Sequence, residues 1–117
     1  MPVSWIDYKG RKILYADYRG LRTEDDMMKN LDSEAGFYTQ THLKILSLND
    51  YRDSVVSNKF MNKVTELGKA TKGKTDKAAV LGVTGLKKIL INGYAKITGQ
   101  HVKIFENEIA AKEYLIT

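Results

Sequence analysis

The stretch from Ala78 to Phe105, which reads AAVLGVTGLKKILINGYAKITGQHVKIF, constrains the fold of this chain more than any other segment. It opens with an apolar run over Ala78 to Val83 that suits a buried strand, and the Thr84-Gly85 pair then marks a turn. Leu86 to Thr98 has the spacing of an amphipathic helix, and Val102 to Phe105 suits a second strand. These features form a complete strand–helix–strand unit, so the sequence predicts an α/β protein with parallel strands.

The remaining residues alternate strand and helix patterns in the same way. Ser4 to Tyr8 and Lys12 to Tyr18 flank Lys9-Gly10 and predict two strands joined by a tight hairpin turn. Thr23 is followed by three acidic residues and predicts a helix start, because acidic groups are favourable at the positive end of the helix dipole. The other expected elements are a helical stripe on Met27, Met28, Leu31, Ala35 and Tyr38, a strand over Leu43 to Asn49, a helix over Lys59 to Lys69, and a helix over Glu108 to Leu115 capped by Asn107.

The predicted element order is therefore ββαβαβαβα, with a five-stranded mixed sheet and four main helices. At 117 residues the chain has room for one hydrophobic core, so we expect residues 1–117 to form a single domain. Right-handed crossovers between neighbouring parallel strands place the three crossover helices on one face of the sheet. We expect the other face to be thinly covered, and we predict a homodimer formed through that face or through the hairpin edge.

The helix predicted over Leu86 to Thr98 has apolar residues around a wide arc. We expect most of that arc to be core, and it consists of Leu86, Ile89, Leu90, Tyr94 or Ala95, and Ile97. Whichever of Ile91 and Tyr94 lies outside the core is a candidate contact for a partner.

The composition excludes several classes of protein. The chain has 43% hydrophobic and 28% charged residues, only short apolar runs, and no apolar signal core in its first ten residues. We therefore expect a cytoplasmic protein with no transmembrane segment and no export signal. The absence of cysteine excludes disulfides, Cys-based zinc sites and thiol catalysis, and it fits a reducing compartment.

The net charge of +5 is concentrated in one part of the chain. Residues 59–103 contain ten Lys or Arg against two Asp or Glu, whereas residues 1–58 contain eight against nine. A basic segment of this kind is either a solvated lysine-rich face or a surface that attracts an anionic partner. Specific nucleic-acid binding is not expected, because the basic segments lack interleaved aromatic residues and a recognition helix.

Several segments together resemble one known family. They are GRKILYADYRGL, the strand Leu43 to Asp50 that ends in Asn-Asp, and VTGLKKILINGYAKITGQHVKIFENEIAAKEYL, with Gly82, Thr84-Gly85-Leu86, Lys87-Lys88 and Gly99 as its most specific positions. This pattern resembles the SpoIIAA-like branch of the STAS superfamily, small bacterial domains related to anti-sigma-factor antagonists. The resemblance covers nearly the whole chain. It implies a non-catalytic regulatory domain that binds a protein partner or a small ligand.

The resemblance also implies candidate phosphoacceptors. In the anti-sigma-factor antagonists, a serine at the start of the helix after the third strand is phosphorylated and switches partner binding. Asp50 matches the strand-end aspartate of that motif, but the Ser-Gly of the acceptor site is absent here. Ser57 lies next to the predicted helix start and Ser54 lies within the loop, so both are candidates. The alternative for Ser57 is a plain N-cap, whose hydroxyl accepts a hydrogen bond from an unpaired helix amide.

The turn after the strand Ala78 to Val83 is a candidate ligand site. Thr84 and Gly85 precede the helix start, and Lys87 and Lys88 lie in its first turn. Unpaired amides at this edge of a parallel sheet attract anions, so the site would take a nucleotide, a lipid headgroup or another anionic metabolite. The segment lacks a complete phosphate-loop or dinucleotide motif. The alternative interpretation is an ordinary helix start whose lysines point to solvent.

No residue pattern indicates catalysis. His42 and His101 stand at strand starts with no carboxylate or hydroxyl at motif spacing, and the adjacent Asp25-Asp26 pair points in different directions along a helix. Two histidines without cysteine also do not predict a structural zinc site. We therefore expect no catalytic residue, no metal and no cofactor.

Overall fold

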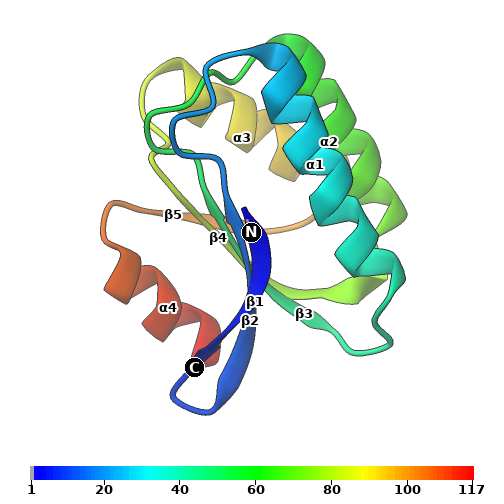
Figure 1. Cartoon of the computed structure of the whole chain (residues 1–117), viewed down its shortest axis with the longest axis vertical. Helices are drawn as coiled ribbons and strands as arrows, with labels where there is room; N and C mark the ends of the chain where they lie inside the picture. Colours follow the sequence, from blue (N-terminus) through cyan, green and yellow to red (C-terminus); the bar gives the residue numbers. More distant parts are fainter. Residues whose placement is uncertain (1) are drawn as a thin grey trace.

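A five-stranded mixed sheet runs through the middle of the molecule, with helices on both of its faces (Figure 1). The structure is a computed structural model that describes residues 2–117. Its elements are β1 (Val3–Tyr8), β2 (Arg11–Asp17), α1 (Glu24–Thr39), β3 (Ile45–Asp50), α2 (Asn58–Ala70), the short 3-10 helix η1 (Lys72–Lys74), β4 (Thr75–Leu81), α3 (Leu86–Thr98), β5 (Val102–Phe105) and α4 (Glu108–Ile116). This order confirms the predicted ββαβαβαβα arrangement. None of the helices among residues 2–117 is both long enough and apolar enough to cross a bilayer.

The strands lie across the sheet in the order β1-β2-β3-β4-β5. β1 is antiparallel to β2, and the tight turn between them has positive φ at both Lys9 (49°) and Gly10 (82°). The other neighbours are all parallel, with Val80 of β4 beside Ile104 of β5. Because parallel strands end at one edge of the sheet, the loops after β2, β3 and β4 meet there.

The bounds of β3 and β4 differ by a few residues from the prediction. β3 begins at Ile45 rather than Leu43, and Leu43 is exposed. β4 ends at Leu81 because Gly82 has a positive φ of 75°, which does not continue a strand. A Cβ on residue 82 would lie 2.4 Å from the Arg52 amide nitrogen. Glycine at this position therefore allows the loop after β3 to pass close to the end of β4.

Helices α1, α2 and α3 cover one face of the sheet, as predicted for right-handed crossovers (Figure 1). The core beneath them combines apolar strand residues with apolar residues from each of the three helices. Its large buried side chains include Leu14, Ile45, Val80, Met27, Leu31, Phe60 and Ile91.

The expectation of a thinly covered second face is wrong. The C-terminal helix α4 folds back over this face (Figure 1), where Ala111 and Leu115 pack against Ile13, Leu48 and Leu81. No strand follows α4, so no crossover rule indicates which face it covers. The homodimer stays a prediction, but it can no longer rest on an open face of the sheet.

The rotation of α3 about its own axis also differs from the prediction. Ile91 is buried and Tyr94 is half-buried against the core, whereas Leu86, Ile89 and Ile97 are exposed. Both sets of residues follow helical spacing, so the sequence pattern does not distinguish them. The contact of α3 with α2 and the sheet selects the set that is buried.

Candidate functional site

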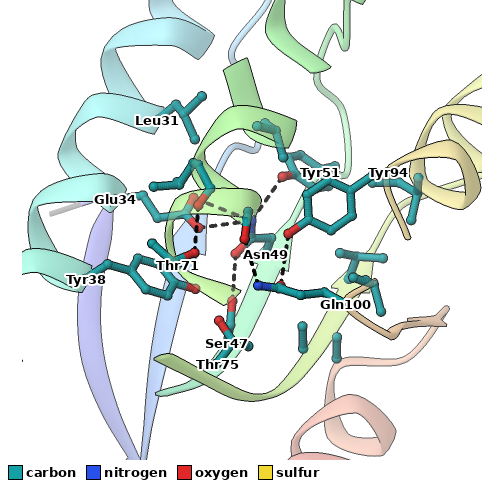
Figure 2. Close-up of a pocket in the computed structure, with 18 residues that line it drawn as sticks. Leu31, Glu34, Tyr38, Ser47, Asn49, Tyr51, Thr71, Thr75, Tyr94 and Gln100 are labelled. Carbon is teal, nitrogen blue, oxygen red and sulfur yellow. Dashed lines mark hydrogen bonds between the residues drawn. The ribbon is translucent and has the colours of Figure 1, made fainter. Parts of the chain in front are cut away.

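A small polar cavity lies between the sheet and helices α1, α2 and α3 (Figure 2). Its volume is ≈ 50 Å³, which is room for about three or four water molecules. Its polar and aromatic lining residues are Glu34, Tyr38, Ser47, Asn49, Tyr51, Thr71, Thr75, Tyr94 and Gln100. Protein interiors bury mainly apolar groups, so this concentration of polar side chains in the centre of the fold marks a candidate site.

Glu34 is the charged group of this cavity. It lies on the inward face of α1, together with Met27 and Leu31, and only 4% of its surface is exposed. Tyr18 Oη donates a hydrogen bond to Glu34 Oε1 over 2.7 Å. Burial raises the pKa of the Glu34 carboxyl, and the hydrogen bonds from Tyr18 and Asn49 oppose that rise. None of the ion pairs among residues 2–117 includes Glu34.

Asn49 holds the Glu34 carboxyl in place from the sheet side. Its Nδ2 atom lies 3.4 Å and 3.3 Å from the two carboxyl oxygens of Glu34, and 3.0 Å from Tyr51 Oη (Figure 2). Its Oδ1 atom accepts from Ser47 Oγ over 3.4 Å. Ser47, Asn49 and Tyr51 share one face because alternate residues of a strand point the same way. The network therefore orients the carboxyl toward the cavity.

Four tyrosines surround Glu34 and are neutral phenols at ordinary pH. Burial is the main cause that raises the pKa of Tyr18, Tyr38 and Tyr51, and it raises the pKa of Tyr94 to about 12. The Glu34 carboxylate adds to each rise, because a second negative charge nearby is unfavourable. Tyr38, Tyr51 and Tyr94 therefore contribute hydroxyl groups and ring faces to the cavity lining, and none of the four phenols contributes a charge.

One wall of the cavity is a contact between α2, α3 and the residues before β5. Tyr94 Oη donates to Gln100 Oε1 over 3.0 Å, and Gln100 Nε2 donates to the Gly68 carbonyl over 3.1 Å (Figure 2). Tyr94 and Gln100 are each partly exposed. These two side chains therefore form a boundary between the cavity and solvent.

Asp50, the strand-end aspartate, belongs to an ion-pair network at the end of β3. Arg52 donates to its carboxylate through Nε over 2.9 Å and through Nη2 over 2.6 Å, and Tyr15 Oη donates over 2.9 Å. Burial alone would raise the pKa of the Asp50 carboxyl, but these hydrogen bonds outweigh it and lower the pKa. Arg52 also pairs with Glu108 of α4 over 3.2 Å. The network therefore joins the loop after β3 to α4.

The residues of the predicted anion site lie at the carboxyl edge of the sheet, but its two lysines diverge. Thr84, Gly85 and Lys88 are exposed. Lys87 is turned inward, and its Nζ atom donates to the Tyr51 carbonyl over 3.0 Å. Burial is the main cause that lowers the pKa of the Lys87 ammonium group. Anion binding at this turn stays a prediction, with Lys88 as its exposed cation.

The structure confirms that Ser57 is the N-cap of α2. Its Oγ atom accepts from the Phe60 amide over 3.1 Å and donates to Glu24 Oε2 over 2.6 Å. A phosphate on Ser57 would therefore stand beside the Glu24 carboxylate. Ser54 Oγ donates to the Tyr51 carbonyl over 2.7 Å within the loop. Phosphorylation of either serine stays a prediction.

The outward face of α3 carries a stripe of apolar residues. We call Leu86, Ile89, Leu90, Gly93 and Ile97 the outer stripe. Leu86 is 71% exposed, Ile89 67% and Ile97 61%, and Leu90 and Gly93 are partly exposed between them. Lys96, three residues after Gly93, is exposed beside the stripe, and Lys88 is exposed elsewhere on α3. The stripe is therefore an apolar surface with a lysine at its border.

The sequence interpretation did not identify Glu34 or Asn49 as site residues. For Glu34 a signal was available. It lies three residues after Leu31 and four before Tyr38, so an acidic residue occupies the apolar stripe of a predicted helix. For Asn49 no local signal was available, because a polar residue near a strand end is common on an exposed face.

No family model and no curated protein matches this chain. A solved structure does match, that of an uncharacterized protein from Shewanella loihica PV-4, described as belonging to the DUF3478 family with a SpoIIAA-like fold. The match covers 97% of this chain and 91% of the other, with a TM-score of 0.72 and 15% sequence identity. The chain therefore has the SpoIIAA-like fold that the resemblance implied. At this identity the likeness extends to the fold alone.

Proposed function

We propose that this chain is a non-catalytic regulatory domain that binds another protein through the outer stripe of α3. The observation that carries the proposal is the exposure of Leu86, Ile89 and Ile97 on one helix face. Large apolar side chains that gather on a surface mark interaction sites more often than scattered ones do. The resemblance to anti-sigma-factor antagonists supports the same proposal, since those domains act by binding partner proteins.

The charge around the stripe indicates the chemistry of the partner. Lys96 lies beside the apolar residues, and the adjacent α2 carries three exposed lysines, Lys59, Lys63 and Lys69, against one exposed acid, Glu66. A protein surface with apolar residues bordered by acidic groups complements this arrangement. A second copy of the chain would bring its own lysines against these, so an acidic partner suits the stripe better.

Site-specific photo-crosslinking in the organism that produces the protein tests this proposal. A benzophenone amino acid replaces Ile89, and the control places it at Ile109 of α4, which is 58% exposed on the other side of the sheet. We expect one acidic protein to crosslink from residue 89 and not from residue 109. With that partner purified, Ile89→Glu should weaken binding at least about tenfold and Ile109→Glu should not. Equal crosslinking from both positions would refute the proposal.

Light scattering at about 100 μM distinguishes binding of an acidic partner from homodimer formation. A homodimer with a micromolar dissociation constant would be formed at that concentration. A monomer is consistent with a heterologous partner. A dimer that Ile89→Glu dissociates would make a second copy the occupant of the stripe. A dimer that survives Ile89→Glu would place the predicted homodimer elsewhere, for example at the β1 edge.

The alternative proposal is an anionic ligand at the Thr84-Gly85 turn. Its support is the exposure of Thr84, Gly85 and Lys88 at a helix start beyond the end of a parallel strand. The inward position of Lys87 leaves this site with less exposed positive charge than the sequence indicated.

A further inference from the structure

The cavity around Glu34 is separate from the proposed protein contact and points to a ligand of its own. Buried carboxylates are normally paired with a cation, because an unpaired buried charge is costly. Glu34 Oε1 accepts from Tyr18 and Asn49, whereas the only hydrogen bond to Oε2 within residues 2–117 comes from Asn49 Nδ2 at 3.3 Å. The second carboxyl oxygen therefore retains capacity for a strong donor.

The other polar atoms of the cavity also leave acceptors unused. Tyr94 Oη donates to Gln100, Ser47 Oγ donates to Asn49, and Thr71 Oγ1 donates to the Leu67 carbonyl, so none of these three hydroxyls donates to Glu34. What remains toward the cavity is a carboxylate, aromatic rings and the hydroxyls of Tyr38, Tyr51 and Thr75, which can rotate to present a lone pair. This set is complementary to a cation that carries several N–H donors, because a carboxylate and ring faces both attract an ammonium group.

The size of the cavity and the protein groups that line it limit which ligands could bind there. Its ≈ 50 Å³ is well below the volume of about 150 Å³ that holds benzene, so a ligand has about one to four heavy atoms. Residues 2–117 contain no group of three or more His, Cys, Asp or Glu side chains placed to hold a metal ion. A single carboxylate suits a monovalent ion better than a divalent metal, which needs several oxygen ligands.

We infer that this cavity is a binding site for a small ammonium ion, ammonium itself or a short primary amine, with Glu34 as its counter-ion. The N–H groups donate to Glu34 Oε2 and to tyrosine hydroxyl oxygens, and a methyl group packs against Leu31 and Ile91 in the same lining. Tyr94 and Gln100, hydrogen-bonded to each other at the cavity (Figure 2), would shield the ion from solvent. Their shielding strengthens the attraction between the ion and the carboxylate, since the field of a charge is stronger away from water.

Titration of the full chain with methylammonium chloride, followed by amide NMR shifts, tests the inference. Potassium chloride and tetramethylammonium chloride at equal ionic strength serve as references for charge alone and for a cation without N–H donors. We expect saturable shifts of the Glu34, Asn49 and Tyr94 amides with methylammonium only. Glu34→Gln keeps the side-chain shape and should weaken binding at least about tenfold, whereas Asp32→Asn, an exposed acid on the same helix, should not change it.

The pH dependence of binding gives a second readout that does not depend on a variant. The titratable groups facing Glu34 are the phenols of Tyr18, Tyr38, Tyr51 and Tyr94, all neutral below their raised pKa values, and the lining residues of α2, β4 and β5 carry no titratable side chain. Methylammonium affinity should therefore fall as pH is lowered through the raised pKa of Glu34. Linear unsaturable shifts, equal shifts with potassium or tetramethylammonium, or unchanged binding in Glu34→Gln would each overturn the inference.

Discussion

Tyr94 of α3 stands directly against Gly68 of α2, where a Cβ added to residue 68 would lie 2.5 Å from the Tyr94 hydroxyl oxygen. That hydroxyl donates to Gln100, which in turn donates to the Gly68 carbonyl. The missing side chain at residue 68 therefore permits the contact that closes one wall of the cavity.

Gly68→Ala should lower the free energy of unfolding by about 1 kcal/mol, although alanine is the better helix former, because overpacking against Tyr94 outweighs the gain in helix propensity. Urea unfolding measures the change. Gly36→Ala is the control, since a Cβ there meets nothing within 4 Å, and it should stabilise the protein by up to about 1 kcal/mol. Equal stabilisation by both substitutions would contradict the prediction. Tyr94→Ala should remove the penalty of Gly68→Ala, because it removes the overlapping side chain.

Glu34→Gln should stabilise the protein increasingly as pH rises. Burial raises the pKa of Glu34 above its unfolded value, so folding takes up a proton between the two values. The stability from this group is complete below the unfolded pKa of about 4.3 and is lost as pH rises through the folded pKa. Unfolding curves from about pH 4 to about pH 8 should therefore diverge between wild-type and Glu34→Gln, but not between wild-type and Asp32→Asn. Parallel curves for wild-type and Glu34→Gln would show that the carboxyl is not penalised by burial.

Ser57→Ala should cost about 1 kcal/mol of stability, because it removes the N-cap of α2. Ser57→Asp retains a cap acceptor but sets a second carboxylate beside Glu24, so it should also be less stable than wild-type. Adding Glu24→Gln to Ser57→Asp should recover that loss. Thermal or urea unfolding of the three variants checks the coupling. A Ser57→Asp protein that Glu24→Gln does not improve would show that Glu24 does not oppose an acid at this cap.

Lys87→Glu and Lys88→Glu should have opposite effects on stability. Lys88→Glu places an exposed acid near the helix start and should stabilise by a few tenths of a kcal/mol, whereas Lys87→Glu loses the bond to the Tyr51 carbonyl and should destabilise by about 1 kcal/mol. Phosphate titration of the same proteins examines the alternative ligand site. If an anion binds at the Thr84-Gly85 turn, Lys88→Glu should weaken it more than the exposed control Lys96→Glu does. Equal weak responses in both variants would count against that site.

Local patterns in the sequence determined the element order of this protein. The alternation of strand and helix spacing predicts ββαβαβαβα because both periods are properties of neighbouring residues. The helix starts at Thr23, Ser57 and Asn107 could be predicted from the sequence for the same reason, because an N-cap side chain bonds the amide three residues later. The right-handed crossover rule then placed α1, α2 and α3 on one face.

Tertiary structure alone decided which faces these elements present and what they enclose. α3 has apolar residues around most of its circumference, so its spacing allows either Ile91 or Ile89 to face the core, and the contact with α2 selects Ile91. α4 covers the second face because Leu115 packs against strand residues such as Leu81, which lies more than 30 residues earlier in the chain. The cavity gathers Glu34 and residues from the sheet and all three crossover helices. Its charge and volume depend on packing between segments distant in the sequence, which no local period encodes.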